Sequence, residues 1–174
     1  NVHLLPDEEI NDNNRLFREG CQALGYRVEQ FPVNLRNCRG SGLCNLGCPN
    51  QAKQGTNRAQ LPMAEKNGVE IVTRCHVDRI EERVLYATVH PQGEYGEPPE
   101  WEPGRYKISA HAIVLAAGAV NSPALLLRSN FGSRLPQLGR YFTTQPALIL
   151  VGEHSREITN YHGHPKSFFC DEFE

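Results

Sequence analysis

The stretch AIVLAAGAVNSPALLLRSNFG, residues 112–132, decides the fold class. It opens with an apolar run that ends in small residues, which predicts a buried strand over 112–118. Asn121 or Ser122 then provides a cap for a short helix, with Pro123 near its first turn and the leucines at 125–127 facing inward. A strand that turns directly into a helix is typical of α/β proteins.

The small residues at the end of this strand are candidates for ligand binding. Ala116, Ala117 and Gly118 leave the backbone bare at the carboxyl edge of the sheet, where a phosphate or an adenosine can approach closely. The same residues would also allow tight packing of strand against helix with no ligand. A short glycine turn does not by itself decide between the two interpretations.

Further strands are predicted on both sides of this stretch. VEIVTRCHVDRI (69–80), VLYATVH (84–90), YKISA (106–110) and ALILVGE (147–153) are apolar or alternating and rich in β-branched residues. A helical stripe begins near Asp7 and ends at Gly25. We therefore expect an α/β fold in which a mixed sheet has helices on its flanks.

The composition is that of an ordinary core-forming protein. The chain has 174 residues, of which 39% are hydrophobic and 22% are charged, and its net charge is −2. It has no block of Lys and Arg, so nothing indicates binding to nucleic acid or to an anionic membrane. The longest apolar run, residues 112–120, is far shorter than the roughly 20 residues of a membrane span.

Residues 118–132 resemble the second signature of the glucose–methanol–choline (GMC) oxidoreductases, a family of FAD-dependent enzymes. Asn130 and Phe131 depart from the family pattern. GCPNQAKQGT, NGVEIVTRCHVDRI and AHAIVLAAGA follow one another as in bacterial members, so the resemblance covers about residues 37–153. The matching positions of the signature are Gly118, Ala119, Ser122, Pro123, Leu125, Leu126, Ser129 and Gly132.

The resemblance implies part of a GMC-type FAD-binding fold. Val77 would offer its backbone amide and carbonyl to the adenine of FAD, and residues 116–118 would pack near the adenosine and the diphosphate. Ser122 and Pro123, which match the same signature, are taken with them as cofactor-binding residues. We expect one partial domain over 1–174, made of a cysteine loop (37–56), FAD-domain strands with the strand–helix turn (69–132) and the start of a substrate-domain region (133–174).

Two features of the family are absent from these residues. No G-x-G-x-x-G is present, and the catalytic His lies in the family's C-terminal part, so no catalytic residue is assigned here. We therefore interpret the chain as an internal segment that is inactive alone. His162 and His164 in HGHP resemble a pair of metal ligands, but two imidazoles in a polar loop are more often solvated.

The cysteine loop NCRGSGLCNLGCPNQAKQGT, residues 37–56, contains Cys38, Cys44 and Cys48. Three thiolates suit a [3Fe–4S] cluster, and the glycines between them let the backbone wrap closely around it. The spacing resembles that of bacterial FAD-dependent glucose dehydrogenases of the GMC family, which carry such a cluster. Zinc would have to recruit Cys75 or His76, and a disulfide or unliganded buried cysteines are further alternatives.

The function that follows is that of an FAD-dependent dehydrogenase. It would oxidise a small-molecule alcohol or the hydroxyl of a sugar, and a cluster in the loop would pass electrons to a cytochrome-type acceptor. The alternative from another class is a non-catalytic Fe–S or zinc-binding electron-transfer module. A structural domain without any cofactor is the third interpretation.

Overall fold

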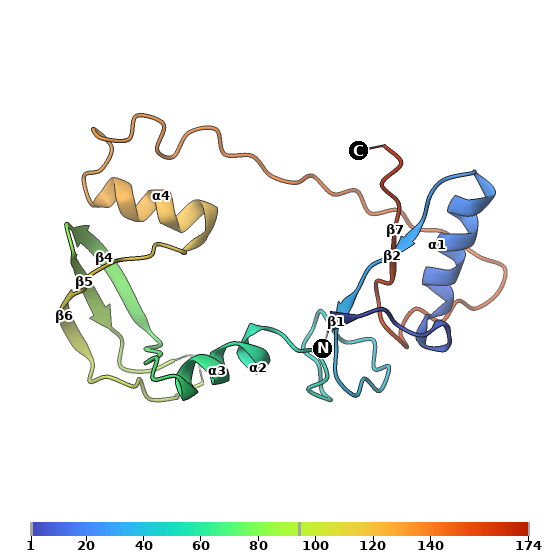
Figure 1. The fold of residues 1–174 in the computed structure, drawn as a ribbon, viewed down its shortest axis with the longest axis horizontal. Helices are drawn as coiled ribbons and strands as arrows, with labels where there is room; N and C mark the ends of the chain where they lie inside the picture. The colour runs from blue at the N-terminus through green and yellow to red at the C-terminus, as the bar shows by residue number, and fades with distance from the viewer. Residues whose placement is uncertain (1, 94, 174) are drawn as a thin grey trace. The chain divides into compact units, whose positions relative to one another are not determined.

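The computed structural model describes residues 2–93 and 95–173, which form two compact units. One unit consists of residues 2–69 with 150–173, and the other consists of the described residues from Glu70 to Ile149. Both units combine helices with short strands (Figure 1). The predicted α/β class is confirmed.

The first unit is built around helix α1 (Asp12–Ala23). Asn11 caps this helix, because its side chain accepts the N–H of Asn14, while the predicted start near Asp7 forms only a 3₁₀ turn. The helix ends at Ala23, and the predicted stop signal, Gly25, follows two residues later with φ +79°. The N–H of Gly25 donates to Gln22 and that of Tyr26 to Cys21, which is the Schellman arrangement.

The strands of this unit are short and pair antiparallel across the sequence. Strand β1 pairs with β3, and β2 pairs with β7. Their bounds are Val2–His3 for β1, Glu29–Gln30 for β2, Val33–Asn34 for β3 and Phe168–Phe169 for β7. The buried side chains of Leu5, Ile10, Val33 and Leu35 form the core.

Two short helices complete the first unit. Helix α2 covers Thr56–Ala59, and α3 covers Leu61–Lys66. Pro62 lies in the first turn of α3, where its missing N–H costs no helical hydrogen bond, so a fresh helix can begin there.

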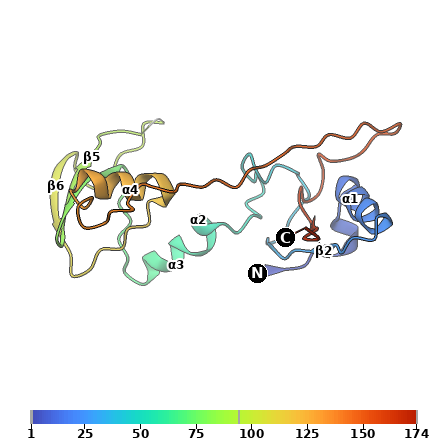
Figure 2. The same cartoon turned by 90° about the horizontal axis from the view of Figure 1, so that it is seen from above.

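The second unit is a three-stranded antiparallel sheet with one helix against it. The strand order is β4 (Cys75–Glu81), β5 (Val84–Val89) and β6 (Gly104–Ser109), which makes β4 an edge strand. Helix α4 (Gly118–Arg128) contacts β4, and Figures 1 and 2 show it beside the sheet. Buried Ile80, Ala87, Val89 and Leu125 form the core.

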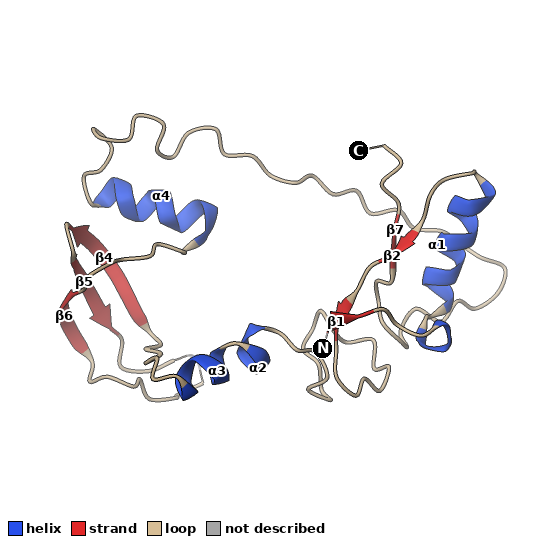
Figure 3. Ribbon diagram, in the orientation of Figure 1, coloured by secondary structure: helices blue, strands red, loops and turns tan. Residues whose placement is uncertain are grey.

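Two predicted strands, and the first residues of a third, have no ladder among the described residues. Residues 69–72, 112–117 and 147–153 are loop in the structure (Figure 3). Val114 is 89% exposed and Leu148 is 93% exposed. An apolar sequence forms a strand only when a neighbouring strand takes up its backbone N–H and C=O groups, and these segments have no such neighbour in the part of the chain that is described.

The start of α4 also differs from the prediction. The helix begins at Gly118, so Asn121 and Ser122 lie inside it and do not cap it. Pro123 lies inside the helix as well, where it cannot donate to the carbonyl four residues earlier. Of the three leucines expected to face inward, Leu125 is buried, whereas Leu127 is 50% exposed.

No helix within residues 2–93 and 95–173 has the length and apolar character that crossing a membrane requires.

Candidate functional site

The start of α4 presents open backbone. Gly118 has φ +81°, and a Cβ added there would meet no atom within 4 Å. Ala117, the N-cap residue, makes no side-chain hydrogen bond, and the first turn contains no acidic residue. The N–H groups of this turn therefore have no side-chain acceptor at the cap and no neighbouring carboxylate, an arrangement that favours an anion.

The other candidate residues of this turn differ in exposure. Ala116, Ala117 and Gly118 are exposed, whereas Ser122 and Pro123 are half-buried within the helix. Ser122 and Pro123 therefore belong to the body of α4 and not to its open end.

Val77 lies on the edge strand β4. It pairs with Ala87 of β5, and the register shifts directly after it, between Val77 and Arg79. A bulge of this kind twists a strand locally and redirects its backbone groups. Within the described residues β4 pairs with β5 alone, so its outer edge carries backbone donors and acceptors that no strand takes up.

A buried serine joins these two elements. The N–H of Ile80 in β4 donates to Oγ of Ser129 at 2.9 Å, and this hydroxyl donates to the carbonyl of Leu125 in α4 at 2.7 Å. Asn130, with φ +61°, ends the helix, and the N–H groups of Asn130 and Phe131 bond to the carbonyls of Leu127 and Leu126. Asparagine tolerates this left-handed conformation, so Asn130 ends the helix without a glycine.

Beside the start of α4 is an apolar hollow that the sequence did not predict. It has a volume of about 600 Å³, and its lining includes Val120, Pro123, Leu127, Gly139 and Phe142. Gly139 has φ +74°, and a Cβ there would lie 3.3 Å from Cδ1 of Leu127. The apolar residues of the helix that lie off its buried face were the one sign of this hollow in the sequence. The segment that covers the hollow has neither helical nor strand periodicity, so its position beside the helix could not be predicted.

The cysteine loop lies in the first unit and is fixed by backbone contacts. The N–H of Gly163 donates to the carbonyl of Gly40 at 2.8 Å. A Cβ on Gly42 would lie 2.5 Å from the carbonyl oxygen of Tyr161, so only glycine fits there without movement of the backbone. Nζ of Lys53 donates to the carbonyl of Cys44 at 3.0 Å. The structure therefore confines the loop on both sides of Cys44.

Cys38, Cys44 and Cys48 are half-buried free thiols with different surroundings. Burial raises the pKa of Cys44, and the neighbouring Cys38 and Cys48 raise it further. The pKa of Cys48 is lowered, chiefly by a hydrogen bond from the backbone of Lys53 and also by the backbone of residues 50–52. Cys38 packs against the core of the unit, and its sulfur accepts the N–H of Gly40 at 3.4 Å.

The three thiols do not form a ready metal site. Among the described residues, no group of three or more His, Cys, Asp or Glu side chains is placed to hold a metal ion. Cys75 and His76, the fourth ligands that zinc would need, belong to β4, where burial raises the pKa of Cys75 and His76 faces Asp78 at 3.9 Å. The loop therefore offers three sulfur donors, but in this conformation the three sulfur atoms do not converge on one point.

Comparison with known proteins identifies one family. The family model described as GMC oxidoreductase matches residues 6–147. An uncharacterized GMC-type oxidoreductase of Mycobacterium tuberculosis is 32% identical over 169 residues, which is 97% of this chain and 26% of that protein. A second, of Sinorhizobium fredii, is 30% identical over 143 residues, covering 79% of this chain and 27% of that protein.

A plant relative carries a more specific name. A long-chain-alcohol oxidase of Arabidopsis thaliana is 30% identical over 159 residues, which is 86% of this chain and 21% of that protein. The chain thus spans about a quarter of the length of the curated relatives that it matches. No solved structure gave a significant match.

Replacing Ser129 tests the contact that joins α4 to β4. In Ser129→Ala the buried N–H of Ile80 loses its acceptor, so we expect a destabilisation of about 1–3 kcal/mol. Urea denaturation of the full-length protein measures this change, and hydrogen exchange over residues 75–81 should accelerate. Ser133→Ala, at an exposed serine four residues further on, is the matched control. Equal stability and exchange in the two variants would show that the Ser129 contact does not fix the helix.

Proposed function

Because the chain belongs to the GMC oxidoreductase family, we propose that it contributes the adenosine- and diphosphate-binding segments of an FAD-dependent enzyme. The observation that supports this most strongly is the open start of α4, where Gly118 and the uncapped first turn leave backbone N–H groups available. When bound, FAD supplies the hydride-accepting chemistry of such enzymes.

The proposed role of the first turn of α4 is to hold the diphosphate. Its N–H groups and the positive end of the helix dipole attract negative charge without any side chain. Gly118 adds no Cβ, so a phosphate oxygen can approach the backbone closely. Ala116 and Ala117 extend this small-residue surface toward the adenosine.

The proposed role of β4 is to hold the adenine. The backbone amide and carbonyl of Val77 would pair with the edge of the base, in the way that a neighbouring strand would. Since β4 is the edge of its sheet, it can accept such a partner without loss of an existing ladder. The Ser129 contact keeps β4 and α4 in one fixed arrangement, so both halves of the adenosine diphosphate would meet a rigid surface.

We propose an alcohol, or the hydroxyl of a sugar, as the substrate class. The long-chain-alcohol oxidases among the relatives support an alcohol. We favour a dehydrogenase that passes electrons to a cytochrome-type acceptor over an oxidase, and this preference depends on the cysteine loop. Without a metal in the loop, an oxygen-using enzyme becomes the better proposal.

We also propose that Cys38, Cys44 and Cys48 hold a [3Fe–4S] cluster. The donor set supports this, since three soft thiolates close together are suited to iron–sulfur chemistry. Metal sites commonly assemble only when the metal binds, so the loop would have to close around the cluster. In the described conformation the three sulfurs do not converge on one point. The second candidate, a non-catalytic Fe–S or zinc-binding module, depends on the same three thiols.

A charge at the start of α4 should weaken FAD binding. Ala117→Asp places a carboxylate where the diphosphate would lie, and we expect the FAD dissociation constant to rise about tenfold or more. Ala117→Asn has the same shape without the charge and serves as the control. Titration of flavin-free full-length protein with FAD, followed by flavin fluorescence, measures both. Equal affinities would place the diphosphate elsewhere.

Metal analysis tests the cluster. Full-length protein purified without oxygen should contain about three irons and a similar amount of acid-labile sulfide per chain, and Cys44→Ser should lose most of both. Cys75→Ser is the control, because it removes a thiol outside the loop that only the zinc alternative would recruit. Stoichiometric zinc, or no metal at all, would contradict the proposal.

A further inference from the structure

Two cysteines outside the loop lie against each other in the first unit. Cys21 is in the last turn of α1, and Cys170 directly follows β7. The two elements are in contact, and the side chain of Cys170 lies within interaction range of the Cys21 thiol. Both cysteines are half-buried and free. Neither belongs to the candidate cofactor or metal sites described above.

Contacts before the pair hold the two segments together. The guanidinium of Arg18, one turn before Cys21, lies 5.1 Å from the centre of the Phe168 ring. Buried Asn14, two turns before Cys21, accepts the N–H of Ser167 at 2.8 Å through its side chain. The chain just before Cys170 is therefore bound along the length of α1.

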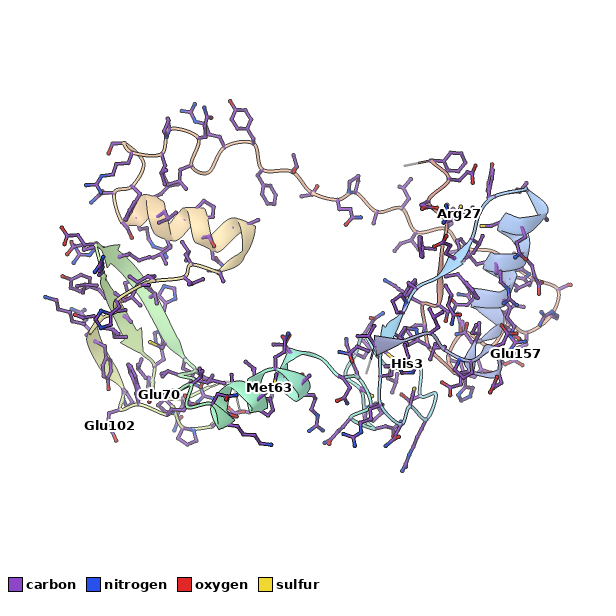
Figure 4. All side chains as sticks on the ribbon, viewed as in Figure 1. His3, Arg27, Met63, Glu70, Glu102 and Glu157 are labelled. Atoms are coloured by element: carbon purple, nitrogen blue, oxygen red, sulfur yellow. The ribbon has the colours of Figure 1, made fainter. Side chains whose placement is uncertain are left out.

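Contacts after the pair also join the two segments, here residues 26–27 with residues 172–173. The rings of Tyr26 and Phe173 meet edge to face with their centres 5.2 Å apart. The backbone N–H of Arg27, a residue labelled in Figure 4, donates to Oε2 of Glu172 at 3.1 Å. Because separate contacts lie on both sides, the meeting of Cys21 and Cys170 does not depend on the thiols themselves.

The thiol environment agrees with this geometry. Burial raises the pKa of Cys21, and the neighbouring Cys170 raises it further. Cys75 offers a comparison within the chain, since its pKa is raised by burial and by the charge of Asp78, with no thiol among the causes. Cys75 is thus half-buried without a second thiol acting on it, so the influence of Cys170 on Cys21 reflects their specific contact and not burial alone.

We propose that Cys21 and Cys170 are a reversible disulfide site that ties the segment after β7 to α1. The oxidant is a low-molecular-weight disulfide such as oxidised glutathione. One protein thiolate attacks it to give a mixed disulfide and one glutathione thiol. The second protein thiolate then displaces the other glutathione thiol, so two protein thiols become one disulfide while one glutathione disulfide becomes two thiols.

The bond would change how firmly the segment is held. The β2–β7 ladder contains only two residue pairs, Glu29 with Phe169 and Gln30 with Phe168, so it can open locally in the reduced protein. Oxidation would close a covalent loop between two positions far apart in the sequence, which restricts the unfolded chain and prevents release of the segment. The state of the pair would thus set the local stability of β7 against α1.

Peptide mapping of the oxidised protein tests the site. Native full-length protein is incubated with oxidised glutathione, blocked with iodoacetamide and digested with trypsin without reduction. Cleavage after Arg18, Arg27 and Lys166 should yield residues 19–27 linked to the peptide that begins at Ser167, with a mass that separates into two on reduction. Cys170→Ser should abolish this linked peptide, and Cys75→Ser should leave its yield unchanged.

Two further measurements decide whether the native geometry is responsible. The yield should fall at least severalfold when the same oxidation is carried out in urea, and hydrogen exchange of residues 167–173 should slow on oxidation of the native protein. A linked peptide formed equally well in urea would overturn the proposal. So would native protein in which Cys21 and Cys170 carry only glutathione or stay unmodified.

Discussion

The hydroxyl of Ser129 is the contact on which the candidate cofactor-binding region depends. It accepts the N–H of Ile80 from the edge strand and donates to Leu125 in the helix, so one buried side chain fixes β4 and α4 together. Because Val77 lies on β4 and Gly118 begins α4, this contact also fixes the two backbone surfaces proposed for adenine and diphosphate. Both surfaces would act through the backbone, so the proposed binding depends less on their own side chains than on the hydroxyl that positions them.

In the cysteine loop, the backbone is confined while the thiols of Cys44 and Cys48 differ in how readily they lose a proton. Close backbone contacts at Gly40 and Gly42 confine it, and hydrogen bonds from the backbone of residues 50–53 favour the thiolate of Cys48, while burial and nearby thiols favour the thiol form of Cys44. A bound metal ion would stabilise all three sulfurs as thiolates. In the proposed cluster site, the metal would therefore have to bring the three sulfurs together.

The sequence predicted the features that depend on local chemistry. The end of α1 just before Gly25 follows from the backbone freedom of glycine, and β4, β5 and β6 follow from β-branched alternation. The strands expected at 112–118 and 147–153 do not form, because a strand also needs a neighbouring strand to pair with. A local sequence pattern does not show whether such a neighbour is present. The cap expected at Ser122 failed because Gly118 already provides the turn into the helix. The pairing of Cys21 with Cys170 arises from tertiary contacts, and the spacing of the cysteines gives no sign of it.

We propose that the start of α4 and the strand containing Val77 together bind the adenosine diphosphate part of FAD. Hydrogen–deuterium exchange of the full-length protein, with and without FAD, tests it most directly. FAD should slow exchange of the amides of residues 118–121 and of Val77 together, while amides of β6 in the same sheet change little. Protection that spares both of these segments, or that reaches them only as part of a uniform slowing of the whole sheet, would contradict it.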